Sequence, residues 1–219
     1  MSNDTNNLIW VDVETTGLDP ETCSLLEVGL VVTTAELEEV CAASWPVYVG
    51  RDRLCAMSAE VRAWHEASGL LAESEQADLL GNVQQEALTF LERNSTKGVS
   101  PMCGSTVGFD RAFLRVHMPL LAAWFHYRSI DVSTVKELAR RWGLPTPPPL
   151  EVRPHRALPD IRNSIAELRF YRDRCFVRGA LDPATTALAA DVLTFIDKGR
   201  KDEALTAATH LAYDLLSRG

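Results

Sequence analysis

The chain has 219 residues and a formal net charge of −8, with 46% apolar and 24% charged residues. This composition suits one ordinary globular domain with room for an appendage, and it excludes a broadly disordered chain. The acidity disfavours binding of long nucleic acids, which are held by many lysines and arginines. If the protein binds nucleic acid, we expect it to bind a short piece through a few placed groups and metal ions.

The chain carries no segment that indicates secretion or membrane insertion. Residues 1–7 lack a basic stretch followed by an apolar one, and the longest apolar run, 118–125, is too short to span a bilayer. The five cysteines are odd in number and form no CxxC pair, which favours free thiols over a zinc site. We therefore expect a cytoplasmic protein without a membrane segment.

The first half begins with strands and continues with helices. Residues 8–13 and 25–34 are apolar and rich in β-branched side chains, and 38–49 is a plausible third strand, so we expect an antiparallel meander. Residues 58–66 and 75–93 have the spacing of amphipathic helices.

The second half alternates extended and helical segments, predicted at residues 99–104, 110–125, 128–132 and 133–142. Ser133 is the expected N-cap of the last of these helices. Five prolines make residues 143–154 an irregular loop, and Pro159 suits the first turn of a helix that runs to about Cys175. This order predicts an α/β fold, a mixed sheet flanked by helices.

The pattern changes after Phe176. Two apolar helical stripes lie on either side of Gly199, a helix breaker, and indicate an αα-hairpin. We expect residues 1–176 to form the main domain and residues 177–219 a helical appendage.

Asp12 and Glu14 stand two residues apart at the end of the first strand. The period of two puts both carboxylates on one side of the sheet, where their mutual repulsion is relieved if they share a cation. Oxygen ligands favour Mg²⁺ or Mn²⁺. The alternative is an ordinary strand edge whose acids face water.

Three further residues complete a possible catalytic set. Asp110 opens a predicted helix, and Asp160 lies in the first turn of another, with His155 on the approach to it. Each has an ordinary interpretation when taken alone: the acids as helix-start residues and the histidine as a solvated loop residue.

Together these residues match a two-metal phosphodiesterase. Asp12, Glu14 and Asp160 would hold one ion, and Asp12 would bridge to a second with help from Asp110. Neutral His155 would take the proton from the attacking water, since its reference pKa of about 6.5 suits work near pH 7.

Four segments resemble the oligoribonuclease family of the DEDDh exonuclease superfamily: VDVETTGLDP, PMCGSTVGFDRAFL, FHYRSIDVSTVKELARRW and HRALPDIRNSIAELRFYR. The resemblance runs from about Leu8 to Cys175. It implies a five-stranded ribonuclease H-like fold and a homodimer that degrades short single-stranded RNA, dinucleotides above all, from the 3′ end. The four acids and His155 take the catalytic positions, with two Mg²⁺ or Mn²⁺ ions as cofactors.

The same resemblance implies a set of substrate contacts. Leu18 matches an apolar wedge against the bases, His65 a substrate-side histidine, and Tyr127 a tyrosine that reaches the partner subunit's site. A polar cluster matches the cap on the 5′ phosphate: Thr106, Arg128, Ser133 and Thr134.

The sequence departs from the family at Thr15, Ser105, Pro159 and Glu60, where the family has methionine, asparagine, aspartate and, in some members, tryptophan. Two other functions stay open at this point. A DNA-directed exonuclease would use the same metals, and Thr15 is typical of proofreading exonucleases. A catalytically idle binding module would lack one of the acids, whereas all the positions are filled.

Overall fold

The computed structural model describes residues 6–55, 57–148, 155–176 and 198–216, together with residues 188, 190–192, 194 and 195. The chain divides into two compact units, Met1–Cys175 and Phe176–Gly219. Among the described residues, no helix combines the length and the apolar character needed to cross a membrane.

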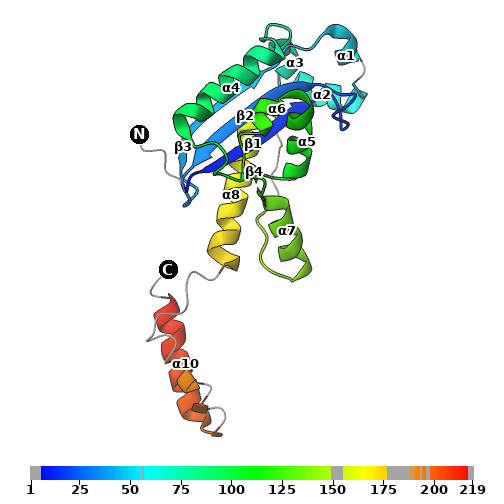
Figure 1. Ribbon diagram of the computed structural model, residues 1–219. Helices are drawn as coiled ribbons and strands as arrows, with labels where there is room; N and C mark the ends of the chain where they lie inside the picture. Colours follow the sequence, from blue (N-terminus) through cyan, green and yellow to red (C-terminus); the bar gives the residue numbers. More distant parts are fainter. Residues whose placement is uncertain are drawn as a thin grey trace. The chain divides into compact units, whose positions relative to one another are not determined.

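Five strands form one mixed sheet in the order β3-β2-β1-β4-β5 (Figure 1). β1 (Leu8–Thr15), β2 (Leu25–Thr33) and β3 (Glu39–Pro46) are antiparallel neighbours. β4 (Met102–Gly104) pairs parallel with β1, and β5 (Ser129–Asp131) pairs parallel with β4. The predicted mixed five-stranded sheet is confirmed, with β1 at its centre.

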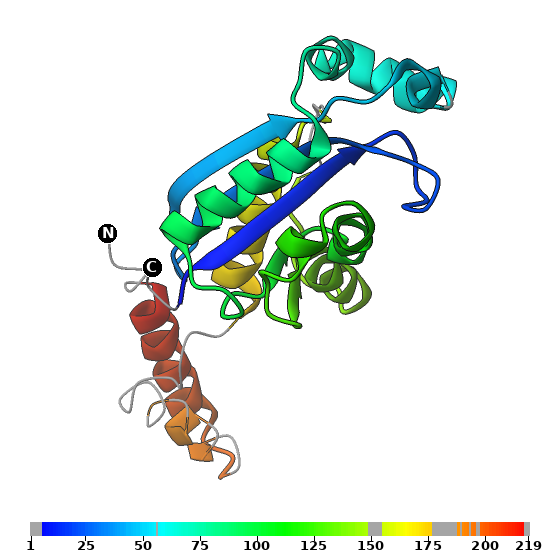
Figure 2. The same ribbon diagram turned by 45° about the horizontal axis from the view of Figure 1, so that its top comes forward.

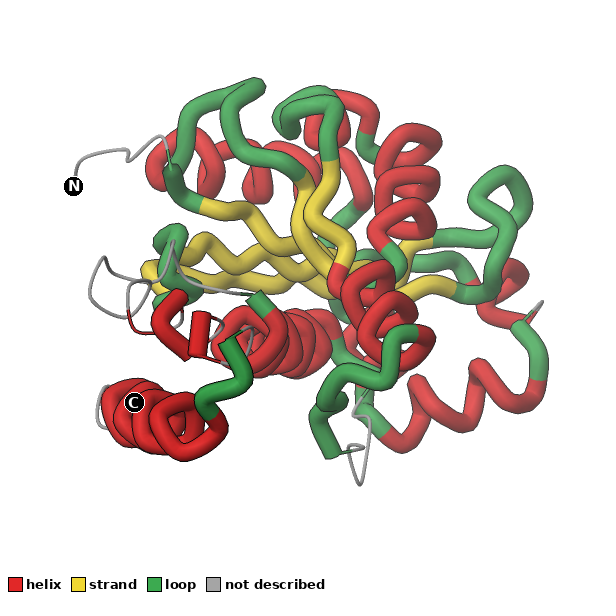
Figure 3. The backbone as a smooth tube through the Cα atoms, turned by 90° about the horizontal axis from the view of Figure 1, so that it is seen from below, coloured by secondary structure: helices red, strands yellow, loops and turns green. Residues whose placement is uncertain are grey.

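Helices lie on both sides of the strands (Figures 2 and 3). In chain order they are α1 (Arg51–Cys55), α2 (Ala59–Ala67), α3 (Leu70–Ser74), α4 (Leu80–Asn94), α5 (Val107–His117), α6 (Pro119–Ala122), α7 (Val132–Arg141) and α8 (Ala157–Cys175).

The alternation of side chains along β1 separates two cores. Ile9 and Val11 pack with the buried side chains of α4 and α5 on one face of the sheet. Trp10 packs with those of α7 and α8 on the other face. Because alternate residues share a face, Asp12 and Glu14 point to the side of the sheet that α8 covers.

The helix predicted over residues 110–125 is two helices. α5 begins at Val107 and ends at His117, and α6 begins at Pro119. Proline disfavours helical dihedrals in the residue before it, and Met118 has φ −133° and ψ 62°. This break turns the chain between the two helices.

Two other predictions need correction, and two short helices were missed. The N-cap of α7 is Asp131, whose carboxylate accepts a hydrogen bond from the Ser133 N–H, so Ser133 lies inside the helix. The helix predicted from residue 75 begins at Leu80. The short helices α1 and α3 were not predicted, because five residues are too few to show a helical period.

The second unit contains α10 (Lys201–Leu216), which corresponds to the second helix of the predicted hairpin. Of the first predicted helix, residues 188, 190–192, 194 and 195 are helical, and the remainder lies outside the described residues. Gly199 has φ +69° and supplies the left-handed turn before α10.

Candidate active site

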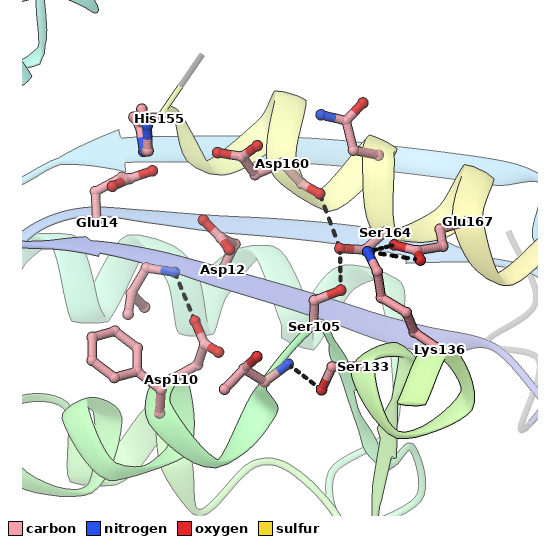
Figure 4. A pocket seen from close by; sticks show the side chains of 14 residues that line it. Asp12, Glu14, Ser105, Asp110, Ser133, Lys136, His155, Asp160, Ser164 and Glu167 are labelled. Atoms are coloured by element: carbon pink, nitrogen blue, oxygen red, sulfur yellow. Dashed lines mark hydrogen bonds and ion pairs between the residues drawn. The ribbon is translucent and has the colours of Figure 1, made fainter. Parts of the chain in front are cut away.

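A cleft of about 510 Å³ opens where the parallel strands β1, β4 and β5 end (Figure 4). The start of α8 and the first turns of α5 and α7 close its sides. Its lining residues are Asp12, Val13, Glu14, Ser105, Thr106, Phe109, Asp110, Ser133, Lys136, His155, Asp160, Asn163, Ser164 and Glu167. All five residues of the predicted catalytic set are among them.

Three acids in the cleft are close enough to share one ion. One carboxylate oxygen from each of Asp12, Glu14 and Asp160 lies within 4.8 Å of the others. Gly29, which pairs with Asp12 across the sheet, allows this approach, because a Cβ at Gly29 would lie 2.6 Å from the Ala157 Cβ. Because glycine has no side chain, the first turn of α8 can pack directly on the sheet beside Asp12.

Asp110 reaches the same cleft from α5. Its Oδ1 accepts a hydrogen bond of 3.0 Å from the Val13 N–H, so the carboxylate is tied to β1 between Asp12 and Glu14. Only 4% of Asp110 is exposed. This hydrogen bond orients a fourth acid toward the other three.

The acids are costly to keep charged in this cleft. Burial raises the pKa of Asp12 well above its ordinary value, and the negative charges of the neighbouring acids add to the shift. Burial, followed by Asp160, raises the pKa of Glu14 to about 8. Burial raises the pKa of Asp110 to about 7, although the Val13 N–H opposes the shift. A divalent cation among these oxygens would offset the repulsion, so the acid cluster suits a hard metal ion.

His155 lines the cleft near Glu14 and is half-buried (Figure 4). Its backbone has φ +49°, an unusual value for a residue other than glycine. The imidazole stacks on the indole of Trp64, with ring centroids 4.6 Å apart and planes 6° apart. The predicted base therefore has a defined ring orientation.

His65 supports the end of β1 from α2. The side chain is buried, and its Nε2 lies 3.0 Å from the Thr15 carbonyl oxygen. Its Nδ1 lies 3.9 Å from a Glu14 carboxylate oxygen. Burial lowers the pKa of His65, which favours the neutral ring. His65 is therefore close to Glu14 but is not among the residues that line the cleft.

The predicted substrate contacts divide into two groups. Thr106 and Ser133 line the cleft, and the Thr106 N–H donates to Asp131 Oδ1 at 2.9 Å and to Ser133 Oγ at 3.2 Å. The other predicted contacts, apart from His65, are exposed and lie outside the lining: Leu18, Tyr127, Arg128 and Thr134. The Arg128 guanidinium stands 5.3 Å from the centre of the Tyr127 ring.

Several residues that the sequence analysis did not single out as site residues also line the cleft, most of them on α7 and α8. Lys136 forms an ion pair of 3.1 Å with Glu167, and Ser105 Oγ lies 2.9 Å from Ser164 Oγ. On α8 the unpredicted residues follow Asp160 by three, four and seven positions, at Asn163, Ser164 and Glu167. That spacing marks one helical face and was a usable signal.

The chain matches known exonucleases in sequence. The RNase_T exonuclease family model matches residues 9–168. The oligoribonuclease of Aliivibrio fischeri is 44% identical over 184 residues, which cover 80% of this chain and 99% of that protein. The oligoribonuclease of Dichelobacter nodosus is 45% identical over 177 residues, which cover 78% and 96%.

Solved exonuclease structures share the fold. Exonuclease I from Methylocaldum szegediense superposes with a TM-score of 0.58 at 18% identity, over 77% of this chain and 41% of that one. E. coli exonuclease I in complex with an oligonucleotide gives 0.59 at 16% identity, over 77% and 41%. This chain thus spans about two fifths of those proteins, and the likeness extends to the ribonuclease H-like fold.

Proposed function

The chain belongs to the oligoribonuclease family of exonucleases, and on that premise we propose that it cuts short single-stranded RNA from the 3′ end into mononucleotides. The observation that carries the proposal is the convergence of the four acids and His155 in one cleft. Cleavage of a phosphodiester needs an activated water and a stabilised leaving oxygen, and this set of side chains suits both tasks.

The acids would bind two divalent ions, Mg²⁺ or Mn²⁺. Asp12, Glu14 and Asp160 would hold one ion, and Asp110, tied to the Val13 N–H, would help to hold the second. When bound, the ions supply a nucleophilic water and neutralise charge on the leaving 3′ oxygen. Asp110 is buried and the other three acids are half-buried, and a divalent cation bound among their oxygens would stabilise their charged forms.

His155 would act as the general base. It lies beside Glu14 at the edge of the acid cluster (Figure 4), and we propose that the attacking water binds next to it. A neutral imidazole accepts a proton readily near pH 7. The stacked ring needs little reorientation to do so.

A protein with a net charge of −8 can bind RNA if the substrate is short, because few phosphates then have to be neutralised. Thr106 and Ser133 line the cleft and are joined by a hydrogen bond, and we propose that they contact the terminal 5′ phosphate together with Arg128 and Thr134. A few charge-assisted hydrogen bonds to one phosphate replace a long basic track. Dinucleotides would then be favoured over longer chains.

A digest of matched RNA and DNA chains of 2, 5 and 20 nucleotides should show the highest kcat/KM for the RNA dinucleotide with a 5′ phosphate. Activity should require Mg²⁺ or Mn²⁺, and the salt dependence should report about one or two phosphates. Equal kcat/KM for the 2-mer and the 20-mer would contradict the preference for short RNA. A preference for DNA would instead support the single-stranded DNA exonuclease that Thr15 favours.

We also propose that the enzyme works as a homodimer in which Tyr127 completes the partner's site. Tyr127 and Leu18 are 75% and 83% exposed, so both side chains are accessible to a second molecule. Light scattering should give twice the chain mass of 24.2 kDa. Replacing Tyr127 with serine should lower activity with the dimer intact. A fully active monomer would contradict the proposal.

We also propose a domain boundary and a cellular location. We assign the exonuclease activity to residues 1–176 and treat residues 177–219 as an appendage, since the family model ends at residue 168. A cytoplasmic location is supported by the free thiols of Cys23, Cys41, Cys103 and Cys175.

A further inference from the structure

The ring of the proposed base rests on a side chain that is not part of the cleft. Trp64, on α2, stacks on His155 with a centroid separation of 4.6 Å and nearly parallel planes. His155 lines the cleft, whereas Trp64 does not. The indole is still 40% exposed, so burial alone does not account for its place against the imidazole.

The helix that carries Trp64 is fixed to the end of β1, the strand of Asp12 and Glu14. Its neighbour His65 is 2% exposed and contacts the Thr15 carbonyl oxygen through Nε2 at 3.0 Å. Ser58 caps the start of α2 by accepting a hydrogen bond from the Val61 N–H. Adjacent residues of one helix therefore reach the end of β1 and the ring of His155.

The backbone beside His155 is held separately. The Arg156 guanidinium donates to both carboxylate oxygens of Glu27, at 3.0 and 3.1 Å, and to both of Glu73, at 2.7 and 2.9 Å. Glu27 is buried and also accepts a hydrogen bond from the Ala157 N–H at 3.0 Å. These contacts hold the chain at the left-handed φ of His155, a conformation that a residue with a Cβ rarely adopts without support.

A fixed backbone still leaves the imidazole free to rotate about its side-chain bonds. Within the described residues, the ring contact that restricts this rotation is the Trp64 stack. Proton transfer depends on the direction of the ring nitrogen, and misplacement by about 1 Å costs on the order of 10²-fold in rate.

We propose that Trp64 is a positioning residue for His155: it holds the imidazole in the orientation in which the ring accepts a proton. This inference rests on the proposed function. The competing role for an aromatic side chain here is a stacking platform for a nucleotide base. The contact with His155 disfavours that role, because one face of the indole is already occupied.

Steady-state kinetics on an RNA dinucleotide separate the two roles. Trp64→Leu should lower kcat by roughly 10- to 100-fold with KM nearly unchanged. Trp64→Phe should restore most of kcat, because a phenyl ring also stacks on imidazole. Trp142→Leu, at an exposed tryptophan outside the cleft lining, is the matched control and should behave as wild type. A rise in KM with kcat unchanged, or no change at all, would overturn the proposal.

Two further measurements isolate the effect on His155. In a His155→Ala background, Trp64→Leu should cause no additional loss of kcat, since the ring that it positions is gone. An additive loss would mean that Trp64 acts elsewhere. In the protein without substrate or metal, the His155 ring protons should show an upfield ring-current shift in NMR that Trp64→Leu removes. An unchanged spectrum would show that the rings do not stack.

These outcomes are distinct from failure of the proposed function. An inactive wild-type protein in the presence of Mg²⁺ or Mn²⁺ would contradict the exonuclease assignment while the NMR shift still reported on the stack. An active wild-type protein with an unaffected Trp64→Leu variant would contradict the positioning role alone.

Discussion

Replacing Asp12 with asparagine should abolish RNA hydrolysis while the protein stays folded. Asp12 lies between Glu14, Asp160 and Asp110, and its oxygens fall within the three-acid group that would hold the metal. Asparagine keeps the shape of the side chain and removes the negative charge, so the variant separates charge from packing. A dinucleotide digest with Mg²⁺ and with Mn²⁺ measures the loss.

Asp52→Asn is the matched control, since Asp52 is an exposed acid on α1 outside the cleft. It should retain wild-type activity. Substantial hydrolysis by Asp12→Asn with Mn²⁺ present would contradict the metal-binding assignment, because no described side chain beside Asp12 can replace its charge without losing its own role.

Thermal unfolding checks that the Asp12 variant is folded and reports on the acids directly. Glu14 has its ordinary pKa of 4.5 when unfolded and about 8 in the fold, so unfolding releases a proton between these values. The metal-free wild type should therefore lose stability as pH rises from about 4.5 to about 8. Asp12→Asn removes one acid from the cluster, so this variant should lose less stability than the wild type over the same pH range. Divalent metal should raise the wild-type Tm at pH 8 and leave that of the variant nearly unchanged.

Replacing His155 with alanine should lower kcat by roughly 10²- to 10⁴-fold with little change in metal affinity. The imidazole lines the cleft but is not one of the three side chains that could together hold a metal ion. Removing it should therefore remove the proton acceptor and leave the metal ligands in place. Steady-state kinetics give the first quantity, and calorimetric titration with Mn²⁺ gives the second.

His210→Ala is the control for the His155 variant, because His210 is exposed on α10 in the second unit. It should change neither quantity. If metal binding collapses in His155→Ala, the histidine is a ligand and the assigned role is wrong. If kcat is unchanged, another group takes the proton.

Much of the site was predictable because local rules place its residues. The period of two along β1 puts Asp12 and Glu14 on one face, and the apolar residues that precede them mark a buried strand. Pro159 indicated a helix start, which the structure places at Ala157, so Asp160 lies in the first turn. These effects act over a few residues and can be read without knowing the packing.

Local rules also explain two errors and an omission. Pro119 divides the helix predicted over residues 110–125, and Asp131, which is as favourable an N-cap residue as serine, stands before Ser133 and caps α7. The face of α8 that contains Asp160 also presents Asn163 to the cleft. Each of these features follows from the local sequence alone.

Contacts between distant segments were decided only by the tertiary structure. Asp110 reaches the cleft because its carboxylate binds the Val13 N–H, 97 positions earlier in the chain. Trp64 meets His155 because α2 is held at the end of β1 and the start of α8 is held near the start of β2, which is its antiparallel neighbour. Such contacts depend on how helices pack against the sheet and on side-chain rotamers, and neither follows from periodicity or composition.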